Sequence, residues 1–209
     1  KMKPDITSAN RILSRKIRVS RNRRCFFFLV NLMVFFYPSM SAGGNLTIDF
    51  ESLKSIPPDK LIIIDTRAKY KYLLGHIPNA VHIGNWSDFT HKNKKVRGLL
   101  IEDPDFIVKK LKRYGIDSNK RIVIYGEPND PWRTDGRFFW MFERFGFEKV
   151  SIFEGGAQHW KRLGNTLEFG PGKSQKISAL SIDDIRLNHE VLADQQWIMK
   201  RIGSKTLAI

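Results

Sequence analysis

Two short apolar runs, Leu61–Asp65 and Arg121–Tyr125, constrain the fold of this chain most strongly. Each contains at least three consecutive aliphatic residues with no polar alternation, which is typical of a strand that is buried on both faces. Further elements are predicted between and after them: strands at Val81–Ile83 and Lys149–Phe153, and helices at Asp103–Tyr114, Asp135–Phe145 and Gly155–Trp160. This alternation of strands and helices predicts an α/β fold with a central parallel sheet and helices on both faces.

The loop after the second run is the most informative segment for function. It spans Gly126–Arg133 and leads directly into the predicted helix. N–H groups of such a loop and the dipole of the helix point at one spot, so they form a cradle suited to anions. In a parallel sheet the carboxyl ends of the strands share one edge, so Asp65 and Arg67 are expected near this loop.

Four motifs occur in order along the chain: IIIDTR, GHIPNAVHI, RIVIYGEPNDPWRTDGR and FEGGAQHW. Together they resemble a rhodanese domain over roughly Ile48–Glu168. The resemblance implies a rhodanese-like three-layer fold. Rhodaneses that transfer sulfur place a nucleophilic cysteine directly after the strand, and here that position is Gly126.

The glycine decides the prediction about catalysis. A sulfurtransferase needs a thiolate that accepts a sulfane sulfur and holds it as a persulfide. Gly126 has no side chain, and the neighbouring Glu127 cannot form a persulfide. We therefore expect no catalytic residue in this domain and only a vestigial pocket loop, with these members: Gly126, Glu127, Asp130, Trp132, Arg133 and Arg137.

Two outcomes are open for the vestigial pocket. The guanidinium groups of Arg133 and Arg137 could hold an oxyanion such as thiosulfate or sulfate. Alternatively, Glu127, Asp130 and Asp135 pair with the arginines and close the pocket, because three carboxylates in one loop would repel an anion.

The other motif residues are expected to be structural. The resemblance implies that Asp65 and Arg67 tie the strand end to neighbouring loops and that His76 is a hydrogen-bonded turn residue. In the EGGAQHW motif, Gly155, Gly156 and Trp160 are expected to let a helix start tightly against the sheet. The five histidines show no metal-ligand spacing, so neither a metal nor a cofactor is expected.

The chain is strongly basic, with a formal net charge of +15. Residues 1–42 carry nine Lys or Arg and a single acidic residue, so about half of the excess lies in this N-terminal part. No nucleic-acid-binding motif accompanies the charge, which favours a solvated basic surface and excludes a nucleic acid as the expected partner.

The N-terminal part is typical of a secretory signal. RNRR precedes the apolar run Cys25–Tyr37, and small residues follow it. The run is shorter than the roughly 20 apolar residues that a membrane span needs. We therefore predict that residues 1–44 are a basic leader plus signal peptide, cleaved between Ser39 and Gly44, and that the protein is exported to the periplasm or secreted. An uncleaved anchor formed by residues 25–37 is the alternative.

The C-terminal part is predicted to begin a second unit. After the rhodanese-like domain (residues 45–168), residues 169–178 form a Gly/Pro/Lys/Ser linker. Residues 179–209 then loosely repeat the opening of the first domain, with Leu207–Ile209 matching the start of Leu61–Asp65. They are therefore expected to be the incomplete start of a second rhodanese-like domain. A C-terminal helix that packs on the first domain is the rival interpretation.

These observations lead to one functional hypothesis and one alternative. The resemblance implies the inactive N-terminal domain of an exported tandem sulfurtransferase, of the thiosulfate or 3-mercaptopyruvate type. The intact parent would move sulfane sulfur from thiosulfate or a mercapto acid to a thiophilic acceptor, and the expected partner is its second domain. First domains of such enzymes often carry aspartate at the cysteine position, and this chain departs from them with Gly126. The alternative is a non-enzymatic module that binds a partner protein or an oxyanion.

Overall fold

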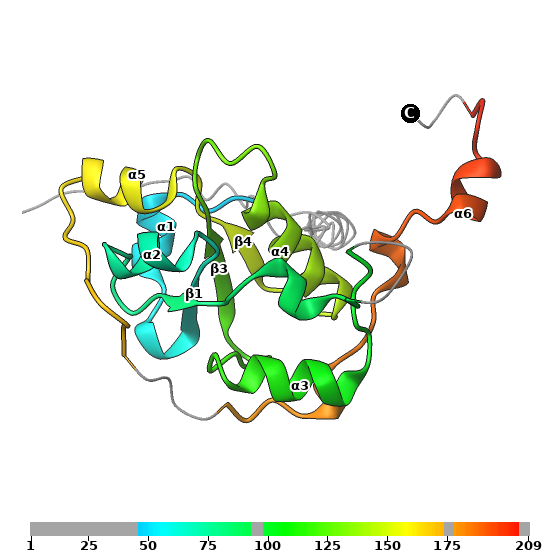
Figure 1. Cartoon of the computed structure of the whole chain (residues 1–209), viewed down its shortest axis with the longest axis horizontal. Coiled ribbons are helices and arrows are strands. Elements are labelled where there is room, and N and C mark those ends of the chain that lie inside the picture. The colour runs from blue at the N-terminus through cyan, green and yellow to red at the C-terminus, as the bar shows by residue number, and fades with distance from the viewer. Residues whose placement is uncertain (1–45, 93–97, 174–177, 205–209) are drawn as a thin grey trace, which may run out of the picture. The chain divides into compact units, whose positions relative to one another are not determined.

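A computed structural model describes residues 46–92, 98–173 and 178–204 of the chain (Figure 1). The predicted leader, with its signal peptide or anchor at residues 25–37, lies outside these ranges, as does the segment Leu207–Ile209. Within the described ranges, no helix has the length and apolar character needed to cross a membrane.

A four-stranded parallel sheet forms the centre of the domain. Its strands are β1 (Leu61–Asp65), β2 (Val81–His82), β3 (Arg121–Tyr125) and β4 (Val150–Ile152), in the order β2-β1-β3-β4. β1 and β3 pair along their whole length, from Leu61 opposite Arg121 to Asp65 opposite Tyr125. The two apolar runs of the sequence are thus the two central strands, and the predicted parallel α/β fold is confirmed.

Helices cover both faces of the sheet, which gives the expected three layers. The helices on the two faces are α1 (Phe50–Ser55), α2 (Lys69–Leu73), α3 (Pro104–Lys112), α4 (Thr134–Arg144) and α5 (Gly156–Arg162). A further helix, α6 (Gln195–Met199), follows them in the chain. Side chains alternate along each strand. Ile62 and Ile64 of β1 therefore pack in the core with residues of α3 and α4, whereas Ile63 packs with residues of α1, α2 and α5.

Local sequence signals explain where several helices begin. Asp49 caps α1 by accepting from the backbone N–H of Ser52 at 2.8 Å. Asp103 accepts from the N–H of Asp105 at the start of α3, where Pro104 occupies the first helical position. Both arrangements satisfy an N–H group that the helix itself leaves unpaired.

The segment 178–191 packs against the first domain. The Ser178 hydroxyl donates to the carbonyl oxygen of Ile116, and the Leu180 side chain is fully buried in the core beside α3 and α4. Ile185 is 9% exposed in the same core, and Trp140 Nε1 on α4 donates to Val191 O at 2.9 Å. The prediction assigned these residues to the end of the linker and the opening of a second domain, but they complete the first core.

α6 follows this segment. Its N-cap Asp194 accepts from the N–H of Trp197 at 2.7 Å, the same N3 capping contact that Asp49 makes in α1. Met199 and Ile202 are 64% and 68% exposed, so this end of the chain contributes little to the first core.

Candidate functional site

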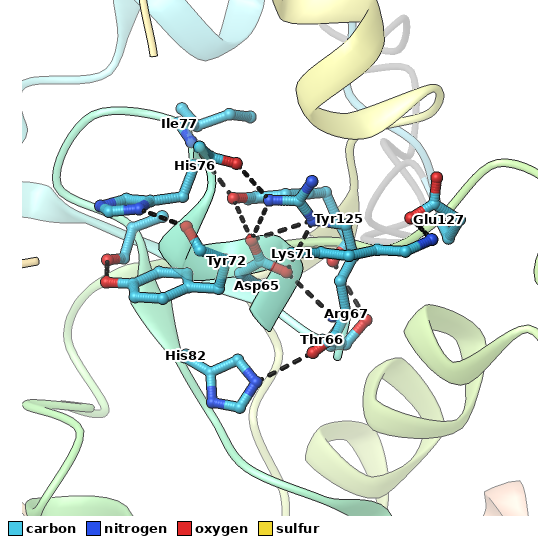
Figure 2. Close-up of polar contacts among 12 residues, drawn as sticks. Asp65, Thr66, Arg67, Lys71, Tyr72, His76, Ile77, His82, Tyr125 and Glu127 are labelled. Atoms are coloured by element: carbon cyan, nitrogen blue, oxygen red, sulfur yellow. Dashed lines mark hydrogen bonds and ion pairs between the residues drawn. The ribbon is translucent and has the colours of Figure 1, made fainter. Parts of the chain in front are cut away.

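Asp65, Arg67 and Glu127 lie near one another at the carboxyl edge of the sheet, where β1 and β3 end (Figure 2). β1 delivers Asp65, and the chain then turns through Thr66 and Arg67 into α2. β3 delivers Tyr125, and the loop Gly126–Arg133 leads on into α4. The pairing of Asp65 opposite Tyr125 places both connections side by side.

Asp65 and Arg67 form a buried ion pair at this edge. The Arg67 guanidinium donates to both carboxylate oxygens, with an Nη2–Oδ2 distance of 2.6 Å. The same Nη2 donates to the carbonyl oxygen of Gly75 at 2.7 Å. Burial alone would lower the pKa of Arg67, but the hydrogen bonds and charge of Asp65 raise it, so the guanidinium stays charged. The pair ties the end of β1 to the turn after α2.

Tyr125 completes this network, although the sequence pattern predicts it only as the last residue of a strand. Its hydroxyl donates to Asp65 Oδ2 at 2.6 Å and accepts from the N–H of Ile77 at 3.2 Å. The side chain is fully buried, and burial together with the charge of Asp65 raises its pKa well above the usual value. A tyrosine at the end of a buried strand, opposite an aspartate, is the signal that could have identified it.

His76 is buried in the turn before β2. Its Nδ1 donates to the carbonyl oxygen of Tyr72 at 2.9 Å, and its ring stacks on the Tyr72 ring with centroids 3.9 Å apart. Nε2 lies 3.8 Å from Glu168 Oε2, which is too far for a hydrogen bond. His76 therefore packs within the domain and does not face the site.

Gly126, where the resemblance places the nucleophile, is buried and tightly enclosed. A Cβ atom there would lie 3.1 Å from both Thr66 Oγ1 and Asp135 Cβ. From the other side, α5 presses on its carbonyl oxygen: a Cβ at Gly156 would lie 2.6 Å from Gly126 O. Gly156 has a φ of +49°, and Gly155 before it has a φ of +75°, so both glycines suit this close helix start.

Trp160, the last residue of the EGGAQHW motif, packs behind this helix start. Its Nε1 donates to Thr166 O at 2.9 Å, and its ring meets the Phe50 ring edge-on at 5.4 Å. The indole is half-buried and holds α5 against α1, away from the loop.

The protein's own carboxylates occupy three N–H groups at the end of the loop and the start of α4. Asp130 accepts from the N–H of Trp132 at 3.0 Å and of Thr134 at 2.9 Å, and also from the Thr134 hydroxyl at 2.5 Å. Asp135 accepts from the N–H of Gly136 at 2.9 Å. Burial raises the pKa of Asp130, but the hydrogen bonds from Thr134 and Trp132 outweigh it, so the pKa lies below the usual range. The end of the loop is therefore already supplied with negative charge.

Only part of the predicted pairing between the loop carboxylates and the arginines is present in the structure. Arg133 pairs with Asp135 at 3.2 Å, but Arg137 lies over the ring of Trp132, 5.5 Å from its centroid. Glu127 binds Lys71 of α2 at 2.8 Å, and this hydrogen bond raises the pKa of Lys71 (Figure 2).

A cleft of about 510 Å³ lies above this edge, between α2, the Gly126–Arg133 loop and the segment at Asn85 and Trp86. Its polar groups include Arg67, Lys71 and Glu127, all engaged in the contacts described above. In the described part of the chain, no group of three or more His, Cys, Asp or Glu side chains could hold a metal ion. None of the described residues that line the cleft is a cysteine.

Comparisons with known proteins agree with this architecture. Residues 49–163 match the family described as the rhodanese-like domain. The Escherichia coli (strain K12) 3-mercaptopyruvate sulfurtransferase is 31% identical over 106 residues, which cover 51% of this chain and 36% of that protein. The probable 3-mercaptopyruvate sulfurtransferase of Schizosaccharomyces pombe is 28% identical over 145 residues, covering 69% of this chain and 47% of that protein.

A solved structure shows the same fold. The crystal structure of SseA from Escherichia coli, a 3-mercaptopyruvate sulfotransferase, matches with a TM-score of 0.64 at 24% identity. The match covers 78% of this chain and 63% of that chain. The chain thus spans between about a third and a half of the length of the two curated relatives named above.

Proposed function

Because this chain belongs to the rhodanese-like domain family, we propose that it contains the non-catalytic first domain of a tandem sulfurtransferase. The observation that carries this proposal is the enclosed glycine at position 126. Sulfur transfer requires a thiolate that becomes a persulfide and then returns to the thiol. The domain has no cysteine, and the side chains around Gly126 are Thr66 and Asp135, neither of which can carry a sulfane sulfur.

The contacts of the loop support the same conclusion. In a sulfurtransferase of this fold, free N–H groups beside the nucleophile are needed to stabilise its thiolate and persulfide. Here Asp130 and Asp135 take the N–H groups of Trp132, Thr134 and Gly136. Pro128 and Pro131 have no N–H group to offer. The loop thus serves as a rigid connection between β3 and α4.

In the proposed parent, a second domain supplies the cysteine. The parent transfers sulfane sulfur from thiosulfate or a mercapto acid to a thiophilic acceptor, and the first domain supports the second. Several relatives are named 3-mercaptopyruvate sulfurtransferase, and one from Gallus gallus is named thiosulfate sulfurtransferase, which agrees with this reaction class. The capping contact of Asp194 repeats that of Asp49, which supports α6 as the first helix of the second domain. In this proposal the second domain begins after Val191.

We also propose that the N-terminal segment directs export, as its sequence predicts. Cell fractionation and N-terminal sequencing of the mature protein test this. A mature N-terminus between Ser39 and Gly44 supports a cleaved signal peptide. A membrane-bound protein that retains residues 25–37 supports the anchor, and a protein that stays in the cytosol with an intact leader contradicts export.

Two experiments test the catalytic proposal. The purified 209-residue chain is incubated with cyanide and either thiosulfate or 3-mercaptopyruvate, and thiocyanate is measured. We expect no thiocyanate above the uncatalysed rate, and clear turnover would contradict the assignment of Gly126. The tandem part is tested by reading the coding sequence beyond Ile209: a strand followed by a cysteine-containing loop is expected, and a stop codon immediately after Ile209 would contradict it.

A non-enzymatic binding module is the second candidate. The N–H groups of Trp132, Thr134 and Gly136 are taken by Asp130 and Asp135 and are therefore not available to an oxyanion. Its protein-binding form is favoured by a groove beside the loop, which contains the 68% exposed side chain of Trp132.

A further inference from the structure

A second concave surface lies on the α4 side of the loop, apart from the cleft above Gly126. It has a volume of about 540 Å³. We call it the Trp–Arg groove, and it is lined mainly by Trp86, Trp132, Arg133, Gly136, Arg137 and Trp140. Three of the five tryptophans of the chain therefore gather on one face, with two arginines between them.

The cations of the Trp–Arg groove are available to a partner. Among the described residues, Arg137 makes no ion pair; its guanidinium lies over the Trp132 ring at 5.5 Å and interacts electrostatically with Asp130. Arg133 donates to Asp135, but its side chain remains 57% exposed. Two guanidinium groups one helical turn apart can hold a carboxylate through several charge-assisted hydrogen bonds.

The backbone of Arg133 is held in an unusual conformation. Its φ of +44° and ψ of 58° lie in the left-handed region, which costs a non-glycine residue roughly 1 to 2 kcal/mol. The surrounding turn fixes this geometry, since the N–H of Arg133 donates to Asp130 O at 3.1 Å. A glycine would meet the backbone requirement without strain, so the arginine side chain needs a separate reason.

The aromatic walls of the groove are fixed from behind. Trp86 packs edge-on against Phe138 with ring centroids 5.6 Å apart, and Trp140 is held by its hydrogen bond to Val191 O at 2.9 Å. Such preformed surfaces lose little conformational entropy when they bind. Trp132, in contrast, is 68% exposed, and its ring lies against the guanidinium of Arg137.

We propose that the Trp–Arg groove binds an acidic protein segment in which a carboxylate neighbours an aromatic or branched apolar side chain. The carboxylate would be held by Arg133 and Arg137, and the apolar side chain would cover Trp132. Tryptophan and arginine are the residue types that most often dominate the energy of protein interfaces. The net positive charge outside the N-terminal part favours the approach of an acidic partner.

Intrinsic fluorescence tests this proposal on the full 209-residue chain, because three of its five tryptophans line the groove. The probes are the tryptophan-free peptides Ac-DEFLED-NH2 and Ac-KKFLKK-NH2. We expect the acidic peptide to change the emission saturably, with an affinity that falls as salt is added. The basic peptide should have no such effect.

Three variants locate the contact. Arg137→Ala and Trp132→Ala should each lower the affinity for the acidic peptide about tenfold or more. Arg133→Gly removes the other guanidinium and also relieves the strained backbone, so weaker binding cannot then be attributed to unfolding. Arg162→Ala on α5, on the opposite face of the sheet, is the matched control and should leave the affinity unchanged.

Several results would overturn the proposal. These are equal binding of both peptides, no binding up to 1 mM, or unchanged affinity in Arg137→Ala. Self-association that Trp132→Ala abolishes would assign the groove to a second copy of the chain. Loss of peptide binding in a two-domain parent would assign it to contact between the domains.

Discussion

Removal of the Tyr125 hydroxyl gives the sharpest test of the network at the sheet edge. Tyr125→Phe keeps the buried ring and its contact with Arg67, whose guanidinium carbon lies 5.4 Å from the ring centroid. It deletes the 2.6 Å hydrogen bond to Asp65 and leaves the N–H of Ile77 without its 3.2 Å partner. The substitution therefore isolates one oxygen atom.

The two lost hydrogen bonds set the expected change in the free energy of unfolding. A hydrogen bond to a charged group contributes about 1.5 to 3 kcal/mol, and an unsatisfied buried donor costs about 1 to 3 kcal/mol. The two contributions overlap, because the ring region can relax, so we expect a loss of about 3 kcal/mol in the free energy of unfolding. With a urea m-value of about 2 kcal/mol/M, the midpoint should fall by about 1.5 M.

The assay is urea unfolding of the full chain, followed by circular dichroism and by tryptophan fluorescence so that two-state behaviour is checked. Tyr70→Phe is the matched control, because the Tyr70 side chain is 60% exposed, and it should change the midpoint by less than about 0.3 M. A loss below about 1 kcal/mol for Tyr125→Phe would refute the claim that this hydroxyl holds Asp65 and the turn at Ile77 together.

Three further predictions concern the loop and its supports. Gly156→Ala should destabilise the domain by roughly 3 kcal/mol in thermal unfolding, since its Cβ would meet Gly126 O at 2.6 Å. Gly164→Ala is the control: Gly164 also has a left-handed φ but no neighbour within 4 Å, so the substitution should cost only about 1 kcal/mol. Gly126→Cys should fold, because the neighbours that its Cβ would meet at 3.1 Å need to shift only slightly. The variant should still produce no thiocyanate from thiosulfate and cyanide. Turnover would instead show that the loop can stabilise a persulfide. The depressed pKa of Asp130 implies stability that is present above its unfolded pKa of about 4 and lost as the pH falls through its lower folded value. Asp130→Asn should therefore flatten the acid side of the stability curve, and an unchanged acid side would contradict this.

The central strands were predictable because their burial on both faces leaves a strong pattern. Leu61–Asp65 and Arg121–Tyr125 are strands with the predicted bounds, and the helix expected at Asp135–Phe145 differs by one residue at each end. At the helix start, Asp130 accepts a hydrogen bond from the N–H of Thr134, the first residue of α4.

The site was less predictable, since its contacts join residues far apart in sequence. That Asp65 and Arg67 share an edge with the loop follows from parallel topology. Side-chain directions in three dimensions decide the other contacts: Tyr125 binds Asp65, and Lys71 rather than an arginine binds Glu127. The role of Leu180 was hidden for a different reason: the apolar residues that follow the linker recur with neither a strand nor a helix period, so the sequence does not indicate which of them is buried.

The burial of Leu180 and Ile185 has a consequence for the order of events during synthesis. The last strand of the sheet ends at Ile152, yet the core beside α3 and α4 is completed by residues about 30 positions later. At roughly 5 to 20 residues per second, a ribosome needs about 2 to 6 s to add them. During this interval the nascent domain exposes the apolar surface that Leu180 will cover.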